Sequence, residues 1–219
     1  QSSGKLLFSA RIIPYRGSWL DFEFDAKDAI FARIDRRRKM PVTVMLHALD
    51  ISNEEILDIF FEKDKFSLSK KVIKLDFRPD HFKGITADFD IKNGRKTIIN
   101  KGQRINGGHL SQLEELAKKN KYLNVPIDHL ENKVIAHDVI EPKTGELLAF
   151  ANEILSIEKI NILIENGIEA IETIHISGLD HGDYISNSMR IDPSSSKQEA
   201  LTEIYRMMRP GEPPTKEAS

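Results

Sequence analysis

The 219 residues contain no cysteine, a single tryptophan and no long run of apolar residues. Without cysteine, the chain can form neither a disulfide framework nor a metal site built from thiolates. A helix that spans a bilayer needs about 20 consecutive apolar residues, so the sequence predicts no membrane partner. The net charge is only −2, which excludes a globally basic nucleic-acid binder. Any contact with DNA must therefore come from a local basic patch.

The short motifs of nucleotide and zinc chemistry are also missing, since there is no GxxxxGKS/T, GxGxxG or HExxH pattern. The histidines are scattered, and the spacing of His129 and His137 does not indicate a metal site. No nucleophile, base and orienting group form a recognisable set, so an independent enzyme acting on a small molecule has little support. The sequence thus predicts no catalytic and no metal-binding residue in this chain.

Strand patterns dominate the beginning of the chain. Apolar and acidic residues alternate over 19–25, and this period of two predicts a half-buried strand. A second strand is expected over 29–34, and a β-rich run over 6–13 precedes both. Short polar turns separate the three segments, so we expect a small antiparallel sheet.

Two helices are expected after this sheet. Pro41 suits the first position of a helix that continues through Leu49, because the missing N–H would have no partner there. The capping box Ser52–Glu55 predicts the start of a second helix. That helix is expected to extend to about Lys63, with Phe60 on its inward face.

The middle of the chain differs in composition from both ends. From about Phe66 the charge density rises and aromatic residues become fewer. Helices are predicted over 109–120 and 156–166, and a strand over 170–176. Gly167 stands where the end of a helix favours a left-handed residue. We interpret this section as a separate α+β module.

The last part returns to the composition of the first, with a helix expected over 195–209. Its apolar face is predicted to hold Leu201, Ile204, Tyr205 and Met208 at helical spacing, with Tyr205 and Met208 in the core. We therefore predict an α+β fold of two domains. Residues 1–60 and 182–219 form one discontinuous domain, and 61–181 form an inserted module. Because the chain starts without Met and ends after a proline-rich turn, we also expect it to be a segment of a longer protein.

The densest charge feature is the segment 33–39, which holds five basic residues and one acid, Asp35. One interpretation is a solvated loop between a strand and a helix. The other is contact with phosphate, because Arg36, Arg37 and Arg38 can neutralise backbone charge while Asp35 orients one of them.

Two further residues are candidates for contact with a ligand. Trp19 is the only tryptophan and follows a Gly-Ser turn, so it is either a packing residue at the start of a strand or a platform on which an unpaired base stacks. Arg209 stands at the end of the last predicted helix, where its positive charge interacts favourably with the helix dipole. There it can also reach a ligand.

The acidic face of the strand over 19–25 is a weaker candidate. Asp21, Glu23 and Asp25 alternate with apolar residues and could form a carboxylate metal site. A solvated face opposite an apolar one explains the same pattern without a metal. We favour the solvated face.

Several segments together resemble the lobe of the bacterial RNA polymerase beta subunit. They occur in the order of that family, at residues 10–25, 33–41, 180–182, 184–186 and 205–215. The last of them reads Tyr-Arg-Met-Met-Arg-Pro-Gly-Glu-Pro-Pro-Thr. The resemblance is strong in 4–61 and 178–219. It is looser in the middle, which is similar to an insertion that only some bacterial beta subunits carry.

This resemblance implies a part of DNA-directed RNA polymerase, a nucleotidyltransferase of transcription, in the cytoplasm and associated with the nucleoid. The implied partners are the other polymerase subunits (beta prime, alpha, omega and sigma) and DNA, above all its non-template strand. Catalytic Mg²⁺ is held by the partner large subunit, so no cofactor is expected in this chain. The lobe would form part of the downstream DNA cleft and would have no catalytic activity by itself.

The resemblance also implies a set of DNA-binding residues at the downstream edge of the transcription bubble. In this sequence they are Trp19, Asp35, Arg36 and Arg209, and the charge pattern of segment 33–39 adds Arg37 and Arg38 to the predicted DNA-binding residues. Trp19 would stack on a non-template base, and Arg209 would line the same pocket. The remaining wall of that pocket is expected from segments outside this chain.

The module over 61–181 carries one misleading similarity and one alternative function. Ala87–Asp90 is similar to the first part of the Mg²⁺-binding loop of the partner large subunit. It lacks the third carboxylate of that loop because Ile91 and Lys92 follow, so we attribute the match to chance. As an alternative function, the module would project outward and serve as a docking platform for transcription factors or phage proteins.

Overall fold

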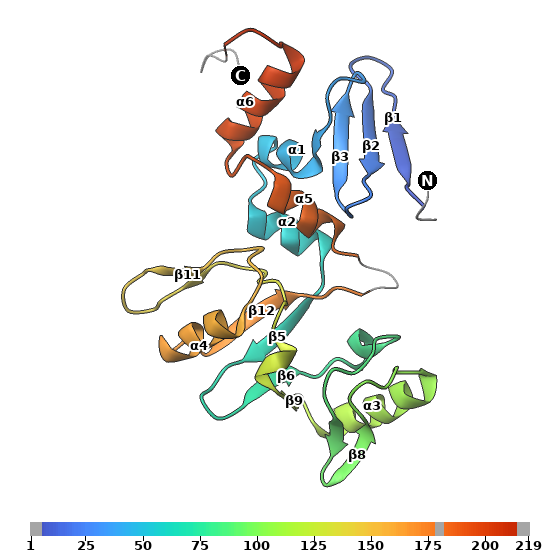
Figure 1. Cartoon of the computed structure of the whole chain (residues 1–219), viewed down its shortest axis with the longest axis vertical. Coiled ribbons are helices and arrows are strands. Elements are labelled where there is room, and N and C mark those ends of the chain that lie inside the picture. Colours follow the sequence, from blue (N-terminus) through green and yellow to red (C-terminus); the bar gives the residue numbers. More distant parts are fainter. Residues whose placement is uncertain (1–5, 178–181, 214–219) are drawn as a thin grey trace. The chain divides into compact units, whose positions relative to one another are not determined.

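A computed structural model describes residues 6–177 and 182–213 of the protein (Figure 1). The chain forms two compact units: the first consists of Gln1–Phe60 and Asp183–Ser219, and the second consists of Phe61–Gly182. Helices and small antiparallel sheets occur in both, so the predicted α+β class is confirmed. Within the described ranges, no helix is long and apolar enough to cross a membrane.

The first unit is built on a four-stranded antiparallel sheet in the order β1-β2-β3-β4. Its strands are β1 (Ser9–Ile12), β2 (Leu20–Phe24), β3 (Ile30–Ile34) and β4 (Met40–Pro41). β2 and β3 confirm the strands predicted over 19–25 and 29–34. Phe22 lies opposite Ala32 in the register, and both face the apolar core. The alternation in the sequence thus reflects one buried and one polar face.

Four helices accompany this sheet. They are α1 (Val42–Ala48), α2 (Asn53–Phe60), α5 (Tyr184–Ile191) and α6 (Lys197–Met208). The core of the unit combines Ala32, Met40 and Val44 with Ala200 of α6, so the late segment of the chain completes a core begun by the early one. Ile204 and Met207 of α6 pack against this core.

The core face of α6 differs from the prediction. Tyr205 and Met208 are only partly buried and lie outside the core cluster. Ile204, which the prediction included, packs against the core together with Met207, at helical spacing from Ala200. The prediction was therefore right for Ile204 and wrong for Tyr205 and Met208 as core residues. Helix α5, which immediately precedes this part of the chain, was not predicted.

The helix ends show which local signals are reliable. The capping box is present, since the Glu55 N–H donates to Ser52 Oγ at 3.3 Å and Glu55 Oε2 accepts from the Ser52 N–H at 2.8 Å. α2 nevertheless ends at Phe60 and not near Lys63, and the Phe60 side chain is exposed and does not face inward. Pro41 precedes the first residue of α1 instead of occupying it.

A buried carboxylate fastens the two segments of the first unit together. Asp192, at the end of α5, accepts from Thr43 Oγ1 at 2.5 Å and lies 3.1 Å from His47 Nδ1, both on α1. Ser194 donates to the same carboxylate through its N–H and its hydroxyl, at 2.7 and 2.6 Å. His47 also reaches Asn53 Oδ1 at 2.8 Å through its other nitrogen. Each polar atom that this network buries therefore has a partner.

The network shifts the pKa of both ionisable partners. The hydrogen bond to Asp192 outweighs burial and raises the pKa of His47. Burial opposes ionisation of Asp192, but hydrogen bonds from His47, Ser194 and Thr43 outweigh it and lower the pKa of that carboxyl. At neutral pH, Asp192 is thus a buried, ionised anchor.

The second unit has a sheet in the order β12-β5-β6-β9, with all neighbours antiparallel. Its strands are β5 (Lys63–Ser67), β6 (Ile73–Asp76), β9 (Tyr122–Val125) and β12 (Ala170–Ile174). The strand predicted over 170–176 is present but ends at Ile174. Because β12 pairs with β5, the first and last strands of the unit are neighbours, with Ile174 opposite Lys63.

Helices and two hairpins surround this sheet. They are η1 (Pro79–Phe82), α3 (Gly107–Lys119), η2 (Ile127–His129), α4 (Ile157–Glu165) and the pairs β7 (Ile91–Asn93) with β8 (Lys96–Ile99) and β10 (Val139–Ile140) with β11 (Leu147–Ala149). α3 and α4 confirm the helices predicted over 109–120 and 156–166. Gly167 follows α4 with a φ of +77°, as its left-handed role requires.

We predict that Asp192→Asn destabilises the first unit by about 3–5 kcal/mol, because it leaves His47 without its buried counter-charge. Trp19 is the only tryptophan and lies in this unit, so its fluorescence during urea unfolding reports the change directly. Asp50→Asn is the matched control, since Asp50 forms an exposed pair with Lys197 and should have little effect. Equal unfolding midpoints for the two variants would contradict the anchoring role of Asp192.

Candidate nucleic-acid interface

Trp19 and Asp35 are held together at the end of the β2–β3 pair. The Asp35 N–H donates to the Trp19 carbonyl at 2.9 Å, and the Trp19 N–H donates to Asp35 Oδ1 at 2.8 Å. Hydrogen bonds from the Ser18 side chain and the Trp19 backbone lower the pKa of Asp35. Asp35 therefore positions the Trp19 backbone, whereas the sequence suggested that it would orient an arginine.

The turn after β3 has an unusual backbone. Asp35 and Arg36 have φ values of +49° and +58°, a region that residues other than glycine rarely adopt. The Arg37 N–H donates to the Ile34 carbonyl at 3.0 Å and closes the turn. Such local strain persists only where surrounding contacts hold it, and here the two bonds between Asp35 and Trp19 do so.

The Trp19 indole is flanked by two guanidinium groups. Arg11 lies 5.4 Å and Arg36 lies 5.3 Å from the ring, within the range of cation–π contact. The Trp19 residue is 37% exposed, so it is not a core residue. Arg11 also pairs with Asp21, and this hydrogen bond lowers the pKa of Asp21. A base that stacks on the indole would therefore meet a site already flanked by positive charge.

Arg37 connects this turn to the end of α6. Its Nη1 donates to the Met208 carbonyl at 2.6 Å, one of the carbonyls that a helix C-terminus leaves without a helical partner. Arg209 is the next residue and is the C-cap of α6. Arg37 thus acts as a structural tie that brings Arg209 toward the Trp19 turn.

Arg209 and Arg38 are the more exposed cations of the predicted set. Arg209 lies 3.4 Å from Glu212 and 5.7 Å from the Tyr205 ring, and its side chain stays largely exposed. Arg38 is exposed and has no ion-pair partner in the part of the chain that the structure describes. Of the predicted residues, the structure joins Trp19 to Asp35 and Arg36, and it joins Arg37 to Met208, the residue before Arg209.

Arg11 is a part of this surface that the sequence analysis missed. It is paired with Asp21 because β1 and β2 place these two residues opposite each other. The charges of Arg11 and Asp21 were visible in the sequence, but the register that aligns them depends on the turn at 13–18. Knowledge of that turn could have identified Arg11.

The acidic face of β2 is an ion-paired surface. Asp21 pairs with Arg11, Glu23 pairs with Arg33 at 2.8 Å, and Asp25 lies 3.5 Å from Lys39. Basic partners thus occupy all three carboxylates. This arrangement agrees better with the favoured solvated face than with a metal site. It also leaves Arg36 and Arg38 as the cations of segment 33–39 that face outward without a carboxylate partner in the described ranges.

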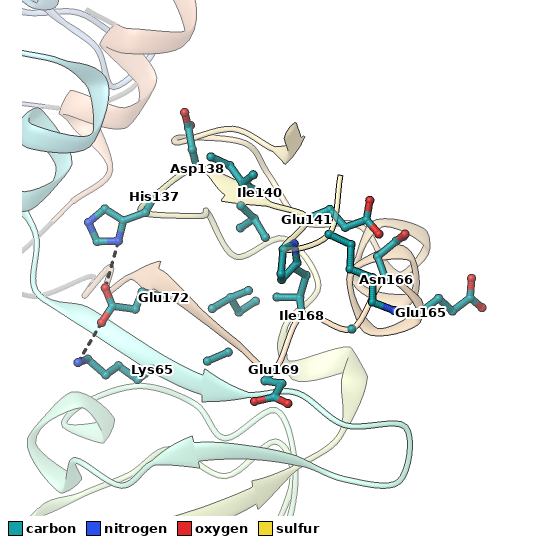
Figure 2. A pocket seen from close by; sticks show the side chains of 16 residues that line it. Lys65, His137, Asp138, Ile140, Glu141, Glu165, Asn166, Ile168, Glu169 and Glu172 are labelled. Carbon is teal, nitrogen blue, oxygen red and sulfur yellow. Dashed lines mark ion pairs between the residues drawn. The ribbon is translucent and has the colours of Figure 1, made fainter. Parts of the chain in front are cut away.

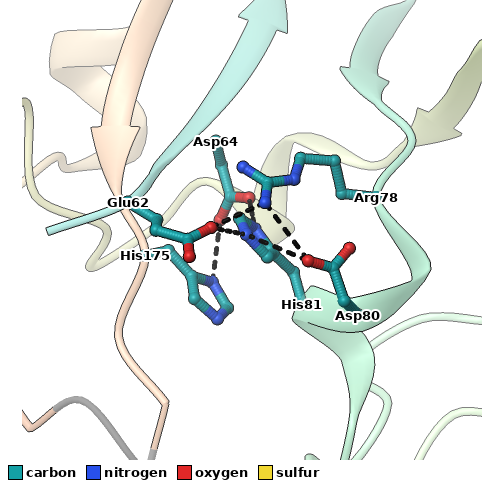
Figure 3. Close-up of polar contacts among 6 residues, drawn as sticks. All are labelled: Glu62, Asp64, Arg78, Asp80, His81 and His175. Carbon is teal, nitrogen blue, oxygen red and sulfur yellow. Dashed lines mark hydrogen bonds and ion pairs between the residues drawn. The ribbon is translucent and has the colours of Figure 1, made fainter.

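A second cluster of ionisable groups lies in the second unit (Figure 3). The buried carboxylate of Asp64 lies 2.6 Å from His81 Nδ1 and 3.4 Å from His175 Nδ1. Glu62 Oε2 lies 2.9 Å from the other nitrogen of His81 and 2.6 Å from Arg78. Because His175 lies 111 positions from Asp64 in the sequence, motif spacing does not predict this cluster.

The donor types of this cluster could hold a divalent metal, since one ligand atom each from Asp64, His81 and His175 lies within 4.8 Å of the others. The two imidazole rings are stacked, however, with centroids 3.8 Å apart and planes 17° apart. Lone pairs in nearly parallel, stacked planes do not converge on one ion. The hydrogen bonds that hold Asp64 already explain the arrangement.

The pKa shifts in this cluster follow from burial and from the hydrogen bonds. Burial opposes ionisation of Asp64, but hydrogen bonds from His175 and His81 outweigh it and lower the pKa of this carboxyl. Burial also opposes protonation of His81, yet its hydrogen bonds to Asp64 and Glu62 raise its pKa. The protonated imidazole and the carboxylate therefore stabilise each other.

Residues 3–86 match the family model described as RNA polymerase Rpb2, domain 2. The matched range contains Arg11, Trp19 and the basic turn at 35–38. It continues past the boundary of the first unit, through β5, β6 and η1 of the second. The match agrees with the resemblance noted in the sequence.

The second unit should be most stable between about pH 4 and 6.5. The contribution of His81 is complete below its unfolded pKa of about 6.5 and is lost as the pH rises through its higher folded pKa. The contribution of Asp64 is lost as the pH falls below its unfolded pKa of about 3.9. Urea unfolding followed by the amide resonance of Ile171, in this unit, measures both limbs. His81→Gln should flatten the alkaline limb, and an unchanged limb would contradict this assignment.

Proposed function

We propose that this chain is a lobe of the RNA polymerase second-largest subunit, because residues 3–86 match domain 2 of that subunit, and that its surface around Trp19 contacts DNA in the downstream cleft. The proposed ligand is the non-template strand at the downstream edge of the transcription bubble. Bases there are unpaired, so an exposed indole can stack on one of them. We call the surface formed by Arg11, Trp19, Arg36 and Arg209 the indole site.

The observation that carries this proposal is the exposed indole flanked by guanidinium groups. A tryptophan that served only to pack would gain more by burial in the core, where Ala32 and Val44 lie. Trp19 is instead held at the surface by backbone hydrogen bonds to Asp35. Aromatic faces next to arginine are the usual platform for single-stranded nucleic acid, because stacking and phosphate attraction act together.

The cations of segment 33–39 have different proposed roles. Arg33 and Arg37 are engaged within the protein, with Glu23 and with the Met208 carbonyl. Arg36 and Arg38 are left to meet phosphates, and Arg36 can also stack on a base beside Trp19. Arg209 can donate in a fork to a base edge or to a phosphate. Asp35 acts as a positioning residue.

The match of residues 3–86 to an RNA polymerase domain supports the proposal that this chain is part of a nucleotidyltransferase complex with other polymerase subunits as partners. We propose that these include the beta prime, alpha, omega and sigma subunits, and that the complex acts at the nucleoid. Catalysis and Mg²⁺ would belong to the partner large subunit. This chain would contribute DNA positioning and no catalytic residue.

As a second function, we propose that the second unit is an inserted module that docks other proteins. The supporting observation is the pairing of β5 with β12, which places Lys63 opposite Ile174. The chain therefore enters and leaves this unit at neighbouring points, as an insertion into a continuous domain requires. The main core cluster of this unit lies within residues 66–171, whereas the cluster of Ala32, Met40, Val44 and Ala200 belongs to the first unit, so we propose that the second unit can vary without disturbing that cluster.

We predict that Trp19→Ala in the reconstituted polymerase speeds the decay of open complexes by about 5-fold or more. One base–aromatic stack contributes roughly 1–3 kcal/mol, and 1 kcal/mol corresponds to about 5-fold. Decay is measured after a heparin challenge, with 2-aminopurine in the non-template strand at the downstream edge as the local probe. Trp19→Phe should retain part of the effect because it keeps an aromatic face.

Phe60→Ala is the matched control for this experiment. Phe60 lies in the same unit and is similarly exposed, at 43%, but it is on α2 and not at the indole site. This variant should leave decay and 2-aminopurine fluorescence unchanged. If Trp19→Ala and Phe60→Ala behave alike, Trp19 does not stack on DNA.

Replacement of the second unit by a short linker between Phe60 and Asp183 should leave basal RNA synthesis intact. The antiparallel neighbours β5 and β12 allow a short connection, and the first unit keeps the core cluster of Ala32, Met40, Val44 and Ala200. Responses to factors that dock on the module should be lost. Runoff transcription with and without cell extract measures both, and loss of basal synthesis by a folded variant would contradict the proposal.

A further inference from the structure

A groove of about 950 Å³ runs beside the edge strand β12 in the second unit (Figure 2). β12 and the end of α4 form one wall, and the segment 137–143, which includes β10, forms the other. Ile140, Ile168 and Ile171 contribute apolar side chains to the lining. The groove is therefore both wide enough for a segment of polypeptide and partly apolar.

The hydrogen-bond pattern shows which groups of β12 face the groove side. The Leu68 N–H donates to the Glu169 carbonyl, and the His175 N–H donates to the Glu62 carbonyl, both at 2.7 Å. In an antiparallel pair, every second residue bonds to the neighbouring strand and the residues between them point their backbone groups away. Residues 170, 172 and 174 therefore direct their N–H and carbonyl groups away from β5.

Only part of that outer edge is occupied. The Ile174 N–H donates to the Val134 carbonyl, and the Glu172 carbonyl accepts from the Ala136 N–H, both at 2.9 Å. Beyond Ala136 the chain turns away. Among the residues that the structure describes, the Glu172 N–H and both backbone groups of Ala170 have no hydrogen-bond partner. They form a short open edge next to the groove.

The charged side chains along the groove are mostly acidic. The acidic residues are Asp138, Glu141, Glu165, Glu169 and Glu172, and the lysines of the lining are Lys65 and Lys143. Lys65 is already paired with Glu172 at 3.1 Å, so it does not neutralise the other acids. The groove would repel nucleic acid and would attract a basic ligand.

We propose that this groove binds an extended peptide with alternating basic and apolar side chains, which adds to β12 as a further strand. The peptide would accept from the Ala170 and Glu172 N–H groups and donate to the Ala170 carbonyl. Its apolar side chains would meet Ile140 and Ile168, and its basic side chains would meet Glu165 and Glu169. This mode uses backbone bonds for affinity and side chains for selection. It deepens the docking role proposed for the second unit.

The test uses the full 219-residue chain and a fluorescein-labelled hexapeptide of alternating lysine and valine with blocked ends. Fluorescence anisotropy measures affinity, and ¹⁵N spectra follow individual amides. We expect saturable binding, with the largest shifts and slowed hydrogen exchange at Ala170 and Glu172. The same peptide with alternate amides N-methylated cannot extend the sheet and should bind at least about 3-fold more weakly.

Two protein variants separate backbone pairing from charge. Ala170→Pro removes an outward N–H and leaves the β5 ladder intact, and it should weaken binding by about 2- to 10-fold. Glu169→Lys should weaken binding at low salt, whereas Glu114→Lys on exposed α3, with the same charge change, should not. The β5 and β12 amide resonances verify that each variant is folded.

The inference fails if binding is equal for the N-methylated peptide, or if the amide shifts lie outside β12 and segment 137–143. Either result would indicate attraction by charge alone. If that occurs while replacement of the second unit still abolishes factor responses, the docking role stands and only the groove is excluded. If peptide binding is confirmed but the replacement changes no response, the groove is a binding site without the proposed docking role.

Discussion

The first unit depends on one buried carboxylate, that of Asp192. Its two chain segments are separated by more than 120 residues, and Asp192 of the later segment joins them by contacts with Thr43 and His47 of the earlier one, while Ser194 also donates to its carboxylate. Ala200 then completes the core, and α6 ends where Arg37 can reach the Met208 carbonyl. This connection therefore helps to hold β1, the turn after β3 and the end of α6, which carry the residues of the proposed indole site, in one unit. The second unit uses the same device, with Asp64 between two histidines.

Fewer basic side chains of segment 33–39 are available to contact DNA than the sequence suggests. Most of the basic side chains of segment 33–39 serve the protein itself, through Glu23, Asp25 and the end of α6. The positive charge left at the surface is concentrated around one indole. A chain with a net charge of −2 can thus present a local cationic site, while the acidic groove of the second unit suits a different and basic ligand.

Local sequence signals predicted the helices and strands, whereas contacts between distant residues determine how the side chains of the candidate sites come together. The alternation over 19–25, the Ser52–Glu55 box and Gly167 each act within a few residues, and all three occur in the structure. The bond between Arg37 and Met208 joins residues 171 positions apart, and the pair of Asp64 with His175 spans 111. No periodicity encodes such contacts. Asp180, His181, Pro214 and Thr215, which supported the family resemblance, lie outside the described residues.

The most direct test of the indole site is a photo-crosslinking side chain at position 19 of the reconstituted polymerase, with position 209 as a second probe and position 60 as a control. In an open complex, we predict a crosslink from position 19 to the non-template strand at the downstream edge of the bubble, and none from position 60. An active enzyme that crosslinks from 209 but not from 19 would contradict it. Trp19 would then be a surface residue that packs on Arg11 and Arg36 without touching DNA.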